Sequence, residues 1–171
     1  MVDHESVPEL ITELHLSGVW GGAILLLVGL AGGLFVVNVF FPSGLVLVAS
    51  GALIGAGAMS WTVAIWAGAG VVLGCSASYA LGRAIGPRFH KSRFAANRRE
   101  LLASAEGLLA RFGAIALFFA YFSGPLRGAA PFAGGLVPLP FVRFQAINIA
   151  SATAWIAATM TPGALLWPVA A

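Results

Sequence analysis

Residues 60–81 read SWTVAIWAGAGVVLGCSASYAL and contain no charged side chain. About 20 apolar residues in a helix cross the roughly 30 Å hydrocarbon core of a bilayer. Trp61 and Trp66 lie toward one end of the stretch, where tryptophans anchor helices at the membrane–water interface. Small residues that permit close helix packing follow, namely Gly68, Gly70 and Gly74. The stretch therefore predicts a membrane-spanning helix.

The composition of the chain extends this prediction. Hydrophobic residues make up 60% of the 171 residues and charged residues only 9%, whereas a soluble domain carries about 25% charged residues. No Asp, Glu, Lys or Arg occurs between Glu13 and Arg83. A water-exposed surface cannot be built from so few charges, so we predict an all-α integral membrane protein.

Apolar stretches of similar length at 19–41 and 144–167 predict two more spanning helices. Gly32-Gly33 should kink the first or bring it close to another helix. Pro162-Gly163 should bend or end the last. Before the first span, residues 1–17 resemble a short amphipathic helix at the membrane surface, which leaves 18–171 as the transmembrane domain.

Two shorter apolar segments, 42–57 and 124–140, are interrupted by Gly and Pro and are too short to cross a bilayer. Such segments are typical of re-entrant hairpins in transporters. Shifting residue 42 onto 125 also places Gly51 on Gly134, and a Trp-containing span follows each segment. The expected fold is three spanning helices plus two opposed re-entrant helical hairpins in an inverted repeat.

Basic residues are concentrated in the connector 83–111. Six of the nine basic side chains of the protein lie there within a short segment, namely Arg83, Arg88, Lys91, Arg93, Arg98 and Arg99. Cytoplasmic loops of membrane proteins are enriched in this way, so the net charge of +3 indicates topology rather than nucleic-acid binding. The connector should be cytoplasmic, with an amphipathic helix over 96–111.

Arg127 is the one cation deep in the second hairpin. An arginine at the centre of the hydrocarbon costs at least about 2.5–3.5 kcal/mol, and all six acidic residues lie in the N-terminal segment or the connector. Arg127 must therefore meet freed backbone carbonyls, water or an anionic ligand. Its planar fork suits phosphate, but an arginine that snorkels to the interface is the competing interpretation.

Residues near the hairpin breaks complete the candidate site. Glycine and proline leave unpaired backbone amides at half-helix ends, which favour anions. The predicted substrate-binding residues are Arg127, Gly124, Pro125, Gly128, Ser43 and Gly44. No catalytic constellation or metal-ligand cluster stands out, because Cys75 is the only cysteine and the three histidines lie outside the spans. We expect no cofactor, no metal and no enzyme activity.

Ordered motifs along the chain carry a family resemblance. They are Phe41-Pro42-Ser43 with Gly51; Gly74 with Tyr79-Ala80-Leu81-Gly82-Arg83; Phe122-Ser123-Gly124-Pro125-Leu126-Arg127 with Pro131; and Arg143-Phe144 with Asn148, Ser151 and Trp155. Together they resemble the DedA family, also called the SNARE-associated or VTT-domain membrane proteins. The resemblance implies opposed re-entrant hairpins and a role in moving lipids across the bacterial inner membrane.

The expected function is that of a flippase- or scramblase-like transporter for an anionic phospholipid or a polyprenyl phosphate, in envelope homeostasis. The alternative is a non-transporting scaffold or accessory subunit of a lipid-phosphate enzyme. Expected partners are membrane lipids, a second copy of the chain or a lipid phosphatase.

Three positions depart from the family pattern. The resemblance implies an acidic residue after the first-hairpin proline, an acidic residue after the glycine matching Gly74, and an arginine before the second-hairpin phenylalanine. This chain has Gly44, Cys75 and Tyr121 at these positions. Without the carboxylates, movement of the lipid should be uncoupled from protons or driven by the membrane potential.

Overall fold

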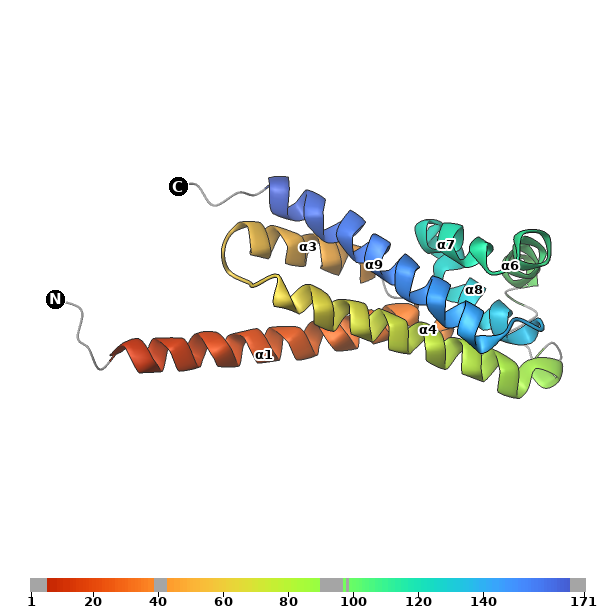
Figure 1. Ribbon diagram of the computed structural model, residues 1–171, viewed down its shortest axis with the longest axis horizontal. Coiled ribbons are helices and arrows are strands. Elements are labelled where there is room, and N and C mark those ends of the chain that lie inside the picture. The colour runs from red at the N-terminus through yellow and green to blue at the C-terminus, as the bar shows by residue number, and fades with distance from the viewer. Residues whose placement is uncertain (1–5, 39–42, 90–96, 98, 167–171) are drawn as a thin grey trace.

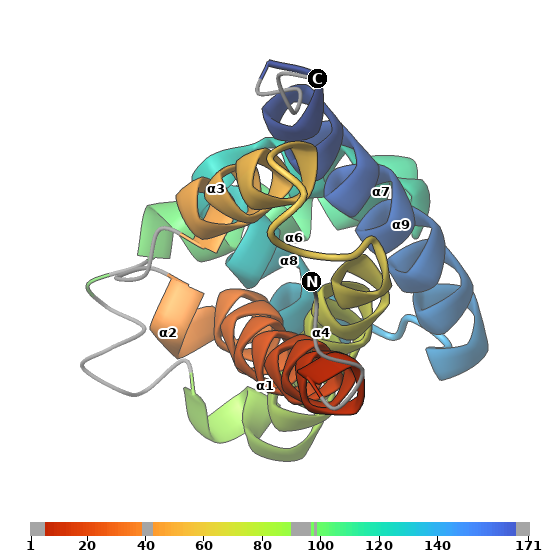
Figure 2. The same ribbon diagram turned by 90° about the vertical axis from the view of Figure 1, so that its left-hand side faces the viewer.

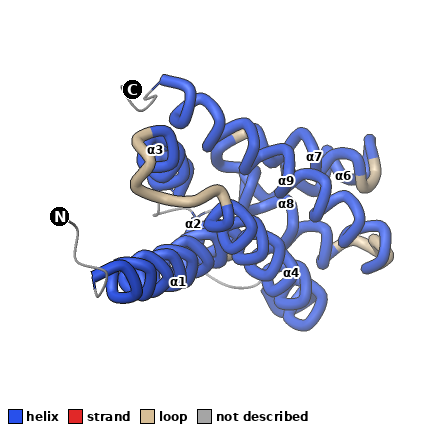
Figure 3. The backbone as a smooth tube through the Cα atoms, turned by 60° about the vertical axis from the view of Figure 1, so that its left-hand side comes forward, coloured by secondary structure: helices blue, strands red, loops and turns tan. Residues whose placement is uncertain are grey.

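The computed structural model describes residues 6–38, 43–89, 97 and 99–166, and every regular element among them is a helix (Figure 1). The tube drawing shows these helices joined by short loops (Figure 3). In chain order the elements are α1 (Ser6–Gly33), α2 (Phe35–Asn38), α3 (Ser43–Gly55), α4 (Thr62–Phe89), α6 (Arg99–Phe112), α7 (Ile115–Phe122), α8 (Gly124–Leu136) and α9 (Phe141–Leu166).

Two described helices are long and apolar enough to cross a membrane, Thr62–Gly86 within α4 and Phe141–Leu166, which is α9. The apolar part of α1, Val19–Gly33, is shorter. Large hydrophobic side chains lie open on the outside of the bundle, for example Ile65 at 74% and Val142 at 78% exposure. A surface of this kind suits hydrocarbon better than water.

The first predicted span is wrong in its boundaries. α1 runs without a break from Ser6 through the expected division at residue 17, and then stops at Gly33. Leu34 forms a bend, and the short α2 follows. The interruption predicted at Gly32-Gly33 is therefore confirmed, whereas residues 39–41 of the predicted span lie outside the described part of the chain.

Glycines bring α1 and α4 into backbone contact. A Cβ added at Gly70 would lie 2.1 Å from the carbonyl oxygen of Leu26, and one added at Gly74 would lie 2.3 Å from that of Leu30. Only glycine permits so close an approach, so the packing role predicted for these two residues is confirmed. Gly68 differs, because its nearest neighbour would be a side-chain atom of Ile156 at 4.0 Å.

Each of the two short helices packs against the long helix of the other pair. α3 lies against α9, and α8 lies against α4 (Figure 2). At the first crossing, a Cβ on Gly51 would lie 2.2 Å from the carbonyl oxygen of Met160. At the second, a Cβ on Gly135 would lie 2.1 Å from that of Tyr79. Each short helix is thus seated on the long helix that follows the other one.

The breaks in the second short segment differ from expectation. The chain reverses at Ser123, between α7 and α8, and α8 continues through Pro131 as one helix. α9 likewise continues past Pro162-Gly163 to Leu166, so the helix does not end there, and the alternative of a bend at these residues stays a prediction. Close contacts explain Gly163, whose added Cβ would lie 2.3 Å from the carbonyl oxygen of Val48 on α3.

The connector is shorter than expected, because α4 continues to Phe89 rather than ending at residue 81. The amphipathic helix predicted over 96–111 is confirmed as α6, Arg99–Phe112. α6 buries Leu102, Ala105 and Leu109 and packs on α8. The connector therefore covers one side of the helix that carries Arg127.

Candidate functional site

Arg127 lies in the first turns of α8, and its side chain is only 3% exposed. Its Nη1 donates to the hydroxyl of Ser43 at the start of α3, over a long 3.4 Å. The guanidinium carbon lies 4.6 Å from the centre of the Trp155 ring on α9 and 5.9 Å from that of Tyr121 on α7. Four helices therefore converge on one buried cation.

The remaining edge of the guanidinium is free. Nε and Nη2 are both buried and have no hydrogen-bond partner within the described residues. These two nitrogens form the side-on fork by which arginine holds two oxygens of a carboxylate or phosphate. Leaving such donors buried and unpaired costs about 1–3 kcal/mol each, and more on a charged group. The described contacts of Arg127 include no carboxylate to offset its charge.

The indole nitrogen of Trp155 is a third buried donor without a partner in the described residues. It belongs to the ring that stacks on the guanidinium. Three unsatisfied N–H groups thus gather at one cationic site, where native proteins normally satisfy buried donors.

The end of α1 and α2 bounds this site. A Cβ on Gly32 would lie 2.5 Å from the Ser43 hydroxyl oxygen and 3.7 Å from Nη2 of Arg127. Glycine at position 32 therefore leaves room for the Ser43 side chain that contacts Arg127. In the orientation that satisfies both neighbours, the Asn38 amide donates to the carbonyl of Gly32 at 2.9 Å and accepts the N–H of Gly128 at 3.3 Å.

The structure brings several predicted site residues together. Ser43 contacts Arg127, and Gly128 packs against Asn38. Gly44 lies beside Trp155, with 3.6 Å between an added Cβ and Cζ2 of the indole.

Other predicted positions lie away from the cluster or are already engaged. Gly124 is exposed, and an added Cβ there would meet nothing within 4 Å. Pro125 occupies the first turn of α8. The backbone N–H groups of Leu126 and Arg127 both donate to the carbonyl of Ser123, at 2.7 and 3.2 Å. The donors left without a partner at this site are therefore side-chain groups, whereas these helix-end amides are engaged.

Sequence reasoning did not assign Gly32, Asn38, Tyr121 or Trp155 to the site. Trp155 and Tyr121 contribute ring faces to the cation, and such contacts stabilise a buried guanidinium. The only sequence signal for these two rings is their position near the hairpin motifs. Their contact with Arg127 arises from the tertiary packing of α7 and α9, which no local pattern shows.

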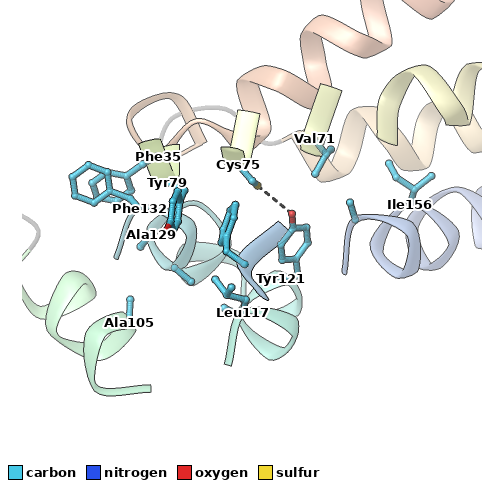
Figure 4. Packing of buried hydrophobic residues seen from close by; sticks show 14 of the residues in the cluster. Phe35, Val71, Cys75, Tyr79, Ala105, Leu117, Tyr121, Ala129, Phe132 and Ile156 are labelled. Atoms are coloured by element: carbon cyan, nitrogen blue, oxygen red, sulfur yellow. Dashed lines mark hydrogen bonds between the residues drawn. The ribbon is translucent and has the colours of Figure 1, made fainter. Parts of the chain in front are cut away.

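Two of the three positions that depart from the family pattern contact each other (Figure 4). The hydroxyl of Tyr121 lies 3.2 Å from Sγ of Cys75 and donates to Oδ1 of Asn148. Where the resemblance implies an arginine and an acid, this chain has a neutral hydrogen-bonded pair. The pair holds the Tyr121 ring beneath Arg127.

A chain of hydrogen bonds continues from this pair. Nδ2 of Asn148 donates to the carbonyl of Val72 at 3.2 Å and to Oγ of Ser76 at 3.4 Å. Ser76 in turn donates to Oε1 of Gln145 at 2.9 Å. Asn148 on α9 therefore joins α7 and α4 through its side-chain hydrogen bonds.

Comparison with known proteins identifies the family. The family model described as the VTT domain matches residues 41–165. The chain belongs to the VTT-domain family. This family, the DedA proteins, comprises membrane proteins regarded as transporter-like and not known as enzymes.

A curated relative of the VTT-domain protein is the inner membrane protein YabI of Escherichia coli (strain K12). The two are 29% identical over 150 residues, which cover 87% of this chain and 59% of the relative. The chain thus spans about three-fifths of the length of that relative. No solved structure matches the chain significantly.

Proposed function

We propose that this VTT-domain protein binds the phosphate of an anionic membrane lipid at Arg127 and moves that lipid across the bacterial inner membrane. The observation that carries the proposal is the free, buried fork formed by Nε and Nη2. A charged donor pair with no protein acceptor is stabilised by a bound anion, and the phosphate of a lipid is the anion that a membrane supplies in quantity.

Burial favours a ligand site over a snorkelling arginine. A snorkelling side chain keeps its charged head in water, but Arg127 is only 3% exposed and its guanidinium lies over the Trp155 ring. The aromatic contacts offset part of the cost of burial. They also hold the fork in one orientation, which reduces the entropy lost when a ligand binds.

The proposed route uses the two short helices. α3 and α8 are each 13 residues long, which is too short to cross a bilayer. We assign α3 to one re-entrant hairpin and the α7–α8 pair to the other, entering from opposite sides of a multi-pass protein. The crosswise packing of α3 on α9 and of α8 on α4 supports this inverted repeat. The phosphate site then lies between the first turns of the two short helices, which the hydrogen bond from Arg127 to Ser43 links.

The proposal is tested by replacing Arg127 in proteoliposomes of phosphatidylcholine with a trace of NBD-labelled phosphatidylglycerol. Loss of a charged hydrogen-bond donor costs about 1.5–3 kcal/mol, so Arg127→Gln should slow lipid translocation by roughly 10- to 100-fold. Arg127→Lys keeps the positive charge but lacks the planar fork, so its translocation rate should lie between those of the parent protein and Arg127→Gln. Dithionite bleaching of outer-leaflet NBD measures the rate.

Arg143→Gln is the matched control, because it also removes one positive charge, from an exposed arginine on α9. Its translocation rate should equal that of the parent protein. Equal rates for Arg127→Gln and the parent would refute the assigned role. If the purified protein moves no lipid but retains a stoichiometric lipid-phosphatase partner, the scaffold role replaces the transporter.

A further inference from the structure

Building on the proposed function, we infer that the site selects a lipid phosphodiester with a single negative charge and rejects doubly charged phosphomonoesters. The inference rests on the number of charges that surround the bound group, with which the free donors are compatible. Both can be counted from the helices that pack around Arg127.

A single full positive charge faces the ligand from the described residues. α3 supplies the hydroxyl of Ser43, α7 the phenol of Tyr121, α9 the indole of Trp155, and α4 the thiol of Cys75 behind Tyr121. All four groups are neutral in their ordinary protonation states at pH 7. A singly charged phosphate therefore gives a complex with no net charge.

The free donors fit a phosphodiester, but their number also fits a phosphomonoester, so the charge count decides between the two ligands. The fork offers Nε and Nη2, and the stacked indole of Trp155 offers a third free N–H. A phosphodiester has two terminal oxygens, which the fork can hold together, one per nitrogen. A phosphomonoester has a third terminal oxygen and a second charge, for which the described site has no second cation.

The second negative charge of a phosphomonoester would be buried beside Arg127 without a cation to pair with it, which is costly. Arg127 is almost fully buried, and interactions of buried charges are poorly screened by water. At pH 7.5 we therefore expect phosphomonoester lipids to bind at least about tenfold more weakly than phosphodiester lipids of the same chain length.

The second pKa of a phosphomonoester is about 6, so acidification converts it into a singly charged ligand. Arg127 remains charged in this range, and the ordinary titration ranges of Cys75 and Tyr121 lie above pH 8. Binding of the phosphomonoester should therefore strengthen between pH 7.5 and 5.5, while that of the phosphodiester stays constant.

The test is a native mass spectrometry titration of the full chain in maltoside detergent. Dioleoyl phosphatidylglycerol is the phosphodiester, dioleoyl phosphatidic acid the phosphomonoester, and dimethyl phosphate the soluble diester. We expect phosphatidylglycerol to bind at least about tenfold more tightly than phosphatidic acid at pH 7.5, and the ratio to shrink at pH 5.5. Dimethyl phosphate should bind much more weakly than either lipid.

A gain-of-function variant keeps the test independent of lost folding. A Cβ on Gly44 would make ordinary van der Waals contact with Trp155, so Gly44→Lys adds a second positive charge on the Trp155 side of the site. It should raise the affinity for phosphatidic acid at pH 7.5 to that of phosphatidylglycerol or above.

Three outcomes contradict different statements. Equal affinity of the parent protein for both lipids at pH 7.5 refutes the charge selection but leaves lipid binding intact. Lipid binding that is unchanged in Arg127→Gln refutes the proposed function itself. Dimethyl phosphate that binds as tightly as phosphatidylglycerol refutes a lipid ligand.

Discussion

The α3–α4 and α8–α9 units share a backbone plan but differ in chemistry. Each begins with a helix of 13 residues and continues into a long helix. Each short helix crosses the long helix of the other unit through glycine. The first unit contributes only the hydroxyl of Ser43 to the site, whereas the second contributes Arg127 and Trp155. The comparison teaches that the two units share a packing plan, whereas the second unit carries Arg127 and Trp155 of the proposed site.

The largest effect should come from the shared packing. Gly51→Ala in the first crossing and Gly135→Ala in the second would each place a Cβ within 2.2 Å of a backbone oxygen. Overpacking of this kind costs about 1–3 kcal/mol, and more where the backbone must move. Both variants should therefore lower the midpoint of thermal unfolding in detergent, measured by circular dichroism.

Gly68→Ala is the control, because its Cβ would meet its nearest neighbour at 4.0 Å. It should be neutral or stabilising by up to about 1 kcal/mol through helix propensity. If only one of the two crossings proves sensitive, the two units do not share a packing plan.

A smaller effect should come from the aromatic face found only in the second unit. Trp155→Leu removes the ring 4.6 Å from the guanidinium carbon, and a buried cation–π contact contributes about 0.5–2 kcal/mol. Affinity for phosphatidylglycerol should fall by roughly 2- to 30-fold, whereas Trp155→Phe should keep most of it. Native mass spectrometry measures both.

Trp66→Leu is the matched control in the first unit, since this tryptophan on α4 is 44% exposed and faces outward. Lipid affinity should not change in that variant. An equal loss from the two tryptophan substitutions would indicate a general effect of tryptophan loss rather than a site confined to the second unit.

The smallest effect should come from the contribution of the first unit. Ser43→Ala removes the 3.4 Å hydrogen bond to Nη1, and a bond of this length is weak. Affinity for phosphatidylglycerol should change by about threefold or less, because a weak hydrogen bond lies at the lower end of the usual range, about 0.5 kcal/mol, which corresponds to roughly twofold. If Ser43→Ala lowered the affinity as much as Arg127→Gln does, Ser43 would contribute as much to binding as Arg127. The conclusion that the second unit carries the main binding groups would then be wrong.

Sequence patterns predicted much of the local structure. The apolar run 60–81, the amphipathic helix 96–111 and the break after Gly33 all have local causes, and all are present in the structure. The break predicted at Pro131 and the helix end considered at Pro162 are wrong, because these predictions rest on the behaviour of proline in water, where it usually breaks helices. Neighbouring helices in a membrane bundle can satisfy the freed backbone groups, so α8 and α9 continue through them.

The site was only partly predictable for a different reason. Arg127 and Ser43 were recognisable because charge and hydroxyl groups are rare in an apolar chain. The ring of Trp155 and the backbone of Gly32 belong to the site only because α9 and α1 fold against α8 and α3. Such contacts join residues far apart in the chain, and no local pattern encodes them.

The crosswise packing of the short helices also governs how the protein is made. α3 completes its contacts only when α9 is present, and Met160 follows Gly51 by 160 − 51 = 109 residues. At about 5–20 residues per second, the ribosome delivers α9 roughly 5–20 seconds after α3. During that interval the glycine face of α3 has no permanent partner. The nascent N-terminal half must therefore wait in the membrane, and the cluster around Arg127, which needs Trp155 of α9, is completed only after α9 arrives.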